Sequence, residues 1–131
     1  MTRNEILVFL QRYLRGVEEG ADPSAFYTPD AVLIEHPNKL APKGVTRDLA
    51  AIIEAGKRGQ AILERQTNEL ESAVIESDHA ALTLRWTGWF KIDIPQLDVK
   101  AGDAMRARFA QFYTLRDGRI ARQETFDCFE S

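Results

Sequence analysis

Few side chains in this sequence could carry out acid–base chemistry. The 131 residues include two histidines and one cysteine. His36 directly precedes Pro37 at the end of a β-rich segment, and an imidazole, with its ordinary pKa of about 6.5, can accept and return a proton at neutral pH. One cysteine cannot form an internal disulfide, and with two histidines it is too little for a structural zinc site. His36 is therefore the first candidate for proton transfer.

Periodic apolar residues predict three helices in the first half of the chain. Over residues 4–19, leucines and a valine recur at three- and four-residue intervals, which predicts an amphipathic helix that ends at Gly20. The Asp-Pro pair that follows predicts a second, short helix. A third helix is expected to begin after Thr46 and to end near Gly56 or Gly59.

The rest of the chain has the composition of β-strands. A turn at residues 28–30 is expected to precede the first strand, and Asp117-Gly118 is a strong hairpin signal. Helices followed by consecutive antiparallel strands predict an α+β architecture. The predicted strands cover residues 31–36, 64–76, 79–92, 105–116 and 119–129.

The composition narrows the classes of partner. Charged residues make up 28% of the chain with both signs interspersed, and the formal net charge is −3. This pattern does not favour nucleic acid, and no stretch approaches the roughly 20 apolar residues that span a bilayer. We therefore expect one cytoplasmic domain over residues 1–131, with a loop near Pro95 and Gly102 reaching beyond it.

The order of three short motifs resembles a known family. The motifs are Phe-Tyr-Thr-Pro-Asp-Ala-Val at 26–32, Leu-Arg-Asp-Gly-Arg-Ile at 115–120 and Phe-Asp at 126–127. Together they are similar to the SnoaL-like branch of the nuclear transport factor 2-like superfamily. The resemblance implies a cone in which three helices pack in the concave face of a strongly bent, mostly antiparallel sheet. The superfamily includes ketosteroid isomerases, polyketide cyclases and members with no known reaction, so the fold alone does not give the function.

Two positions resemble catalytic positions of the ketosteroid isomerases, and a third does not. Tyr13 matches a tyrosine that donates a hydrogen bond to the oxygen that becomes negative, although it could equally be a core aromatic residue. His36 matches the general base, although it could simply close a strand. Counting back from the Asp-Gly turn at 117–118, Ala110 stands where those enzymes carry a protonated aspartate, so steroid isomerisation as such is not expected.

Strand alternation from Ala110 then predicts the lining of a pocket. Asp127 is expected to be a further catalytic residue, and it could instead form a structural ion pair with Arg108. The resemblance implies a homodimer contact on the opposite, convex face, which is expected to carry Arg85, Trp89, Arg106 and Gln111. A register slip of one residue would reverse every assignment. The expected ligand-binding residues are Phe26, Leu84, Trp86, Arg108, Phe112, Gln123 and Thr125.

Three functions are consistent with these candidate catalytic and ligand-binding residues. The first is an isomerase- or cyclase-type enzyme that acts without metal or cofactor on a compact apolar carbonyl compound. The second is a protein that binds a small molecule in the same pocket without chemistry. The third is a dimeric association domain whose convex sheet face is the functional surface.

Overall fold

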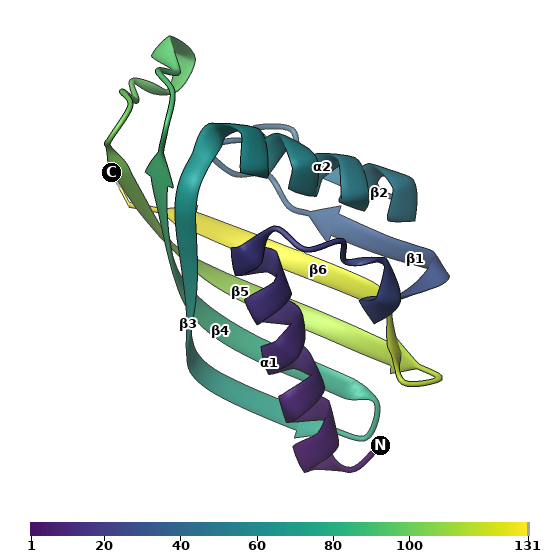
Figure 1. The fold of residues 1–131 in the computed structure, drawn as a ribbon. Coiled ribbons are helices and arrows are strands. Elements are labelled where there is room, and N and C mark those ends of the chain that lie inside the picture. The colour runs from purple at the N-terminus through teal and green to yellow at the C-terminus, as the bar shows by residue number, and fades with distance from the viewer. Residues whose placement is uncertain (131) are drawn as a thin grey trace.

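Two helices lie on one side of a curved sheet in a computed structural model, which describes residues 1–130 (Figure 1). The strands follow the order β2-β1-β6-β5-β4-β3 across the sheet. β1 and β6 run parallel, and the other neighbouring strands are antiparallel. The elements are α1 (Arg3–Glu19), η1 (Ser24–Phe26), β1 (Tyr27–Glu35), β2 (Val45–Arg47), α2 (Leu49–Ile62), β3 (Leu63–Glu76), β4 (His79–Phe90), η2 (Pro95–Leu97), β5 (Ala104–Arg116) and β6 (Arg119–Phe129).

The ends of α1 are set by local hydrogen bonds. Thr2 and Glu5 form a reciprocal capping box at the amino end, and Gly20 closes the carboxyl end with a φ of 70°. The apolar face of α1 packs on the sheet through Ile6, Leu10 and Leu14, which are buried. Each such leucine contributes about 1.5–3 kcal/mol to folding through the area it removes from water.

The prediction of three helices is wrong, because the second one is a single 3-10 turn of three residues. The Asp22 carboxylate accepts a hydrogen bond from the Ser24 backbone N–H at 2.9 Å and fixes a tight turn. β1 then begins at Tyr27, so the expected turn at 28–30 lies inside a strand. A register shift between Tyr27 and Val32 accommodates this stretch.

The start and end of α2 also differ from the prediction. A three-residue strand, β2, occupies residues 45–47, and the helix cap is Asp48, whose side chain accepts from the Ala51 backbone N–H at 2.9 Å. The helix passes through Gly56 and Gly59 and ends three residues later. A glycine inside a helix lowers its stability but does not end it when the flanking residues are packed.

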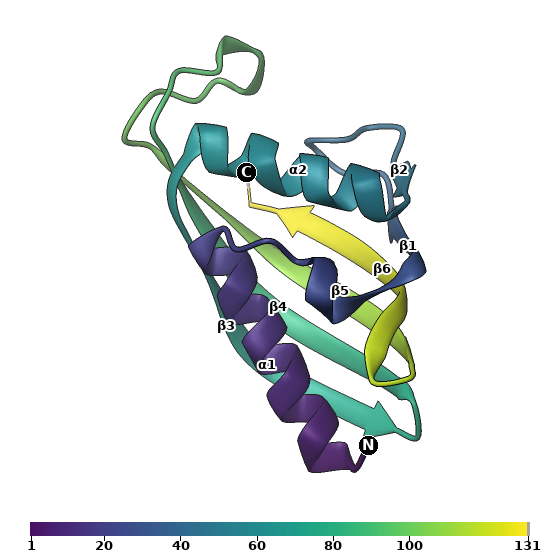
Figure 2. The ribbon, with the colours of Figure 1, turned by 45° about the vertical axis from the view of Figure 1, so that its right-hand side comes forward.

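The helices and the loop between β4 and β5 leave one side of the sheet bare. The 45° turn between Figures 1 and 2 shows α1 along β3 and β4 and α2 above the β1–β6 side. The 91–103 loop projects past the end of the sheet, as expected. We call the helix-covered side the concave face and the opposite side the outer face.

Glycine substitutions in and beside the helices test these boundaries. Gly59→Ala should raise the free energy of unfolding by roughly 0.5–1 kcal/mol, because a Cβ there meets no neighbour within 4 Å. The matched change Gly20→Ala should lower it, because Gly20 has a positive φ and a Cβ there would meet the Gln60 side chain. Denaturant unfolding measures both, and destabilisation by Gly59→Ala would contradict the helix boundary.

Candidate functional site

The alternation of β4 confirms which of its residues face the helices. Every second residue from Ala80 to Phe90 is buried, and Leu84 and Trp86 belong to this set. Leu84 is completely buried in the core beneath α1. Trp86 lies further along the strand, in a second apolar cluster.

The predicted face of β5 is wrong. Phe109 pairs with Leu84 across the β4–β5 ladder, and the buried residues of β5 are the odd-numbered ones. Arg108, Ala110 and Phe112 therefore point to the outer face. The count from the Asp-Gly turn placed Ala110 inside, whereas the alternating apolar residues of the strand itself would have given the correct face.

His36 lies on the outer face as well, and the expectation that it reaches the pocket is wrong. Its ring stacks on Phe126 with 4.0 Å between centroids, and its Nε2 lies 3.0 Å from a Glu124 carboxylate oxygen. The preceding residue, Glu35, faces inward as the ladder partner of Thr125. The parallel pairing of β1 with β6 sets this orientation, and neither strand's sequence shows that pairing.

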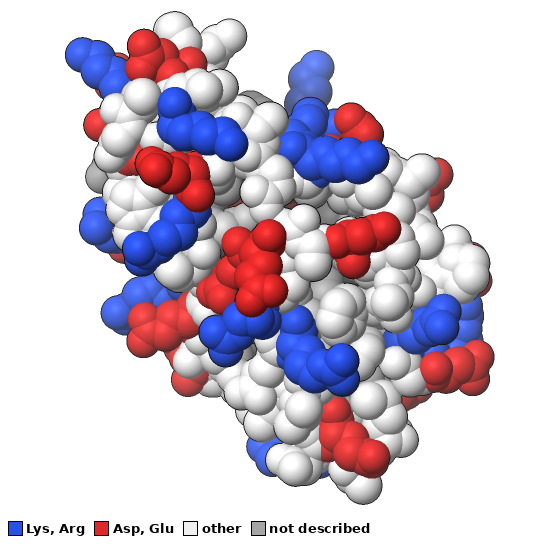
Figure 3. All heavy atoms as spheres, viewed as in Figure 1, with Lys and Arg blue, Asp and Glu red and all other residues white. Residues whose placement is uncertain are grey.

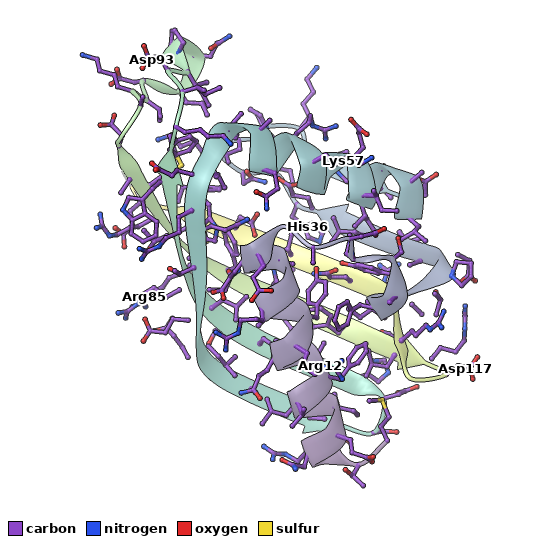
Figure 4. The ribbon with its side chains drawn as sticks, in the orientation of Figure 1. Arg12, His36, Lys57, Arg85, Asp93 and Asp117 are labelled. Carbon is purple, nitrogen blue, oxygen red and sulfur yellow. The ribbon has the colours of Figure 1, made fainter. Side chains whose placement is uncertain are left out.

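The suggested ion pair between Arg108 and Asp127 does not form. The Arg108 Nε lies 3.7 Å from a Glu71 carboxylate oxygen on the outer face. Asp127 is on the concave side, as predicted, together with Gln123 and Thr125. The outward positions predicted for Arg85, Trp89 and Arg106 are confirmed, and Arg85 projects away from the helix-covered side in Figure 4. The outward position predicted for Gln111 is wrong, because the odd-numbered residues of β5 face the helices.

A closed ring of hydrogen bonds lies beneath α1. The Tyr27 hydroxyl donates to Gln123 Oε1 at 2.5 Å, the hydroxyls of Tyr13 and Tyr27 are 2.7 Å apart, and Gln123 Nε2 donates to the Tyr13 oxygen at 3.3 Å. Because Tyr27 uses its proton on Gln123, Tyr13 must be the donor to Tyr27. Burial raises the pKa of both tyrosines, so their hydroxyls stay protonated. Phe26 packs its ring edge against Tyr13.

A hydrogen-bond chain leads from this ring to Asp127. Gln123 Nε2 also donates to the Tyr113 hydroxyl at 3.4 Å, and Tyr113 donates to Gln111 Oε1. Gln111 Nε2 donates to Thr125 Oγ1 at 3.3 Å, and the Thr125 hydroxyl donates to Asp127 Oδ1 at 2.5 Å. Burial raises the pKa of Tyr113 well above its ordinary value. The Asp127 carboxyl is thus the titratable end of a neutral chain.

The surroundings of Asp127 bring its pKa towards neutrality. The pKa of Asp127 is raised from 3.8 to about 6: burial is the largest cause and raises it, the Thr125 hydrogen bond lowers it, the Glu35 carboxylate raises it, and Arg47 lowers it. Arg47 donates to Glu35 Oε1 at 2.6 Å. Glu35 therefore has a cation of its own, whereas Asp127 has none in contact.

Three aromatic rings stand beside this carboxyl. Phe109 is the cross-strand partner of Asp127, and its ring stacks on Trp86 with 5.6 Å between centroids. Phe129 packs edge-on against both rings. Trp86 Nε1 donates to Gln66 Oε1 at 2.9 Å. We call Trp86, Phe109 and Phe129 the aromatic wall.

Four side chains of the concave face are only partly buried. Glu35, Phe109, Asp127 and Phe129 face the helices, yet none of them is fully buried. A half-buried carboxyl beside apolar rings can exchange a proton with a bound molecule. Sequence reasoning missed Glu35, Phe109 and Phe129, although the alternation of Met105, Ala107 and Phe109 is a signal that could have found the wall.

The outer face is apolar at its centre. Phe112 and Phe126 are 46% and 42% exposed, and Val74 at its margin is 68% exposed. Hollows of about 370 Å³ and 350 Å³ lie on either side of the two phenylalanines. Charged side chains of both signs are interspersed on the helix-covered side (Figure 3).

The described residues contain neither a metal-binding cluster nor a membrane-spanning helix. Over residues 1–130, no three histidine, cysteine, aspartate or glutamate side chains are grouped so that they could hold a metal ion. Within the same range, no helix has the length and apolar character needed to cross a membrane.

Comparison with known proteins gives one sequence family and many similar structures. Residues 10–123 match the model of the SnoaL-like domain. IdmH from Streptomyces antibioticus, a proposed polyketide cyclase, is 21% identical, with a TM-score of 0.74 over 91% of this chain and 88% of its own. AclR from Streptomyces galilaeus, a proposed hydroxylase, is 14% identical, with a TM-score of 0.79 over 98% and 82%.

A third similar structure is a proposed polyketide cyclase from Acidithiobacillus ferrooxidans. It is 22% identical, with a TM-score of 0.75 over 97% of this chain and 91% of its own. At these identities the likeness shows the fold alone. No protein with a curated description matches the chain.

Replacing Asp127 tests its environment through stability. Its folded pKa of about 6 exceeds the ordinary value of 3.8, so its neutral form stabilises the fold below about pH 4, and this stability is lost as the pH rises through 6. Asp127→Asn should therefore be more stable than wild type at about pH 8, by on the order of 3 kcal/mol at most. Denaturant unfolding at both pH values measures the difference, which should vanish near pH 4. If Asp127→Asn and the wild type had the same free energy of unfolding at both pH values, the burial of this carboxyl would be contradicted.

Proposed function

Because the chain belongs to the SnoaL-like family, we propose that it binds a compact, largely apolar carbonyl compound on the concave face and transfers protons with Asp127. The observation that carries this proposal is the Asp127 carboxyl beside the aromatic wall, with its pKa raised to about 6. A group whose pKa lies near the working pH is both a competent base and a competent acid.

The proposed reaction is a proton shift of the isomerase or cyclase type. Ionised Asp127 removes a proton from the carbon next to the carbonyl, the C–H bond breaks, and its electron pair moves to the carbonyl oxygen. The neutral acid then returns the proton to another atom of the same molecule. Neither half-step requires a cofactor, because the carbonyl group itself accepts the electrons.

The aromatic wall supports a flat or ring-shaped ligand. Trp86 and Phe109 are nearly parallel, with 24° between their planes, and aromatic faces bind apolar rings by stacking. The partial burial that raises the pKa of Asp127 also strengthens its electrostatic interaction with a bound polar group. The Tyr13 hydroxyl is engaged with Tyr27 and Gln123, so it is linked to Asp127 through the hydrogen-bond chain.

Steroid isomerisation is still not expected. The inward-facing positions of β5 next to Ala110 carry Phe109 and Gln111 instead of an aspartate, so no protonated carboxyl on that strand can hold an enolate oxygen.

A panel of small ketones, lactones and quinones tests the function. In a Trp89→Phe background, Trp86 is the only tryptophan and its fluorescence reports binding. For a compound that binds, Asp127→Asn should retain affinity and lose product, measured by mass spectrometry, by about 10²-fold or more. His36→Gln is the matched control, because the His36 ring stacks on Phe126 on the outer face. Product formation unchanged in Asp127→Asn would reject Asp127 as the proton carrier, and binding without product in wild type would indicate a ligand carrier.

We also propose that the outer face joins two copies of the chain. Two exposed phenylalanines flanked by two hollows form a surface that is apolar at its centre, and a two-fold interface requires one patch that fits itself. Soluble monomers rarely expose a large contiguous apolar patch. Such a patch therefore commonly marks a site where proteins associate.

Phe126→Glu should convert the dimer to a monomer, because it buries a carboxylate at the centre of the interface. Light scattering coupled to gel filtration measures the mass. Val8→Glu is the control, since Val8 is a similarly exposed apolar residue on α1. A dimer that persists in Phe126→Glu would place the interface elsewhere.

A further inference from the structure

The direction of the hydrogen-bond chain is set at Tyr113. Its hydroxyl oxygen already accepts a hydrogen bond from Gln123 Nε2, and the side chain is almost completely buried. Its proton therefore needs an acceptor inside the protein, and the side-chain oxygen of Gln111, Oε1, accepts it. A buried hydroxyl proton without an acceptor would be costly.

This contact fixes the orientation of the Gln111 amide. With Oε1 turned to Tyr113, Nε2 must face Thr125, and it lies 3.3 Å from Thr125 Oγ1. Thr125 accepts this bond and is left with its own proton to donate, which it places on Asp127 Oδ1 at 2.5 Å. Each donor in the chain then has one acceptor, and among residues 1–130 no buried side-chain nitrogen or oxygen lacks a partner.

The opposite orientation of Gln111 is disfavoured for the same reason. Rotating the amide would bring Nε2 towards Tyr113, whose oxygen would then face two donors while its proton faced none. The Thr125 hydroxyl could then turn to Gln111 and leave Asp127. The buried Tyr113 hydroxyl thus holds the chain in one direction through a residue that does not touch Asp127.

We propose that Gln111 is a positioning residue: its amide keeps the Thr125 hydroxyl pointed at Asp127 Oδ1, so that Asp127 takes up and releases protons through Oδ2. This inference rests on the proposed function of Asp127. An oxygen that already accepts a short hydrogen bond is the weaker base of the pair, which leaves the other oxygen for the ligand. The charged groups acting on the same carboxyl are Glu35 on β1 and Arg47 on β2.

Carboxyl carbon NMR titration of Asp127 without ligand tests the inference separately from any reaction. Thr125→Val removes the donor and should make Asp127 about tenfold weaker as an acid, the effect expected for one lost hydrogen bond to a charged group. Thr125→Ser keeps the hydroxyl and should restore the wild-type value. Gln111→Met should weaken the acid in the same direction, because Thr125 is then free to turn.

A double variant shows whether Gln111 acts through Thr125. Gln111→Met combined with Thr125→Val should titrate like Thr125→Val alone, since the effect of Gln111 requires the hydroxyl. Gln11→Met is the matched control, because Gln11 is an exposed residue of α1 outside the hydrogen-bond chain and the aromatic wall. If Met at 111 prevents folding, Gln111→Asn, which is too short to reach both partners, takes its place. A wild-type pKa of Asp127 in the Gln111 variant, or additive effects in the double variant, would overturn the proposal whatever the outcome for Asp127 in turnover.

Discussion

Four polar side chains are buried between α1 and the sheet, and they are linked to one another by hydrogen bonds. Tyr13, Tyr27 and Gln123 satisfy one another in a ring, and Tyr113 extends it. The cost of an unpaired buried hydroxyl fixes the direction of every proton in this group. The hydrogen-bond chain then runs outward from the buried ring through Tyr113 and Gln111 to Asp127, and of its members Gln111 and Asp127 are only partly buried.

Strand alternation divides the sheet between two kinds of surface. The concave face of β5 and β6 carries Gln111, Thr125, Asp127 and most of the aromatic wall. The outer face of the same strands carries Phe112 and Phe126, and His36, just after β1, stacks on Phe126 there. Neighbouring residues thus belong to different environments: Glu35 lies inward with Arg47, and His36 lies outward with Glu124. Because successive side chains of a strand point to opposite faces of the sheet, two residues adjacent in sequence can have different roles here.

The sequence predicted the elements with clear local signals. The α1 periodicity, the Asp-Gly hairpin and the long strands were correct, and so was the inward placement of Asp127 and Trp86. Residues 22–26 were misjudged because a cap pair predicts a helix start without its length. β2 was missed because three residues give no period. Gly56 and Gly59 were taken as helix ends, although α2 continues through both.

The candidate site was only partly predictable, for a different reason. The assignment of Arg108 and Phe112 depended on a count from a distant turn, and an error of one residue turned the strand over. His36 was misplaced because the parallel pairing of β1 with β6 is a long-range feature. The raised pKa of Asp127 arises from burial and from Glu35, 92 positions earlier in the chain, so no local motif could have indicated it.

The most direct test of this account is the pKa of the Asp127 carboxyl in the wild-type protein, measured by carbon NMR with Asp127→Asn to assign the signal. The account predicts a value of about 6, because burial beside the aromatic wall disfavours the charged form. A value at or below about 4, as for an exposed aspartate, would mean that the carboxyl is solvated and ionised at neutral pH, and would contradict its role as the proton carrier of the concave face.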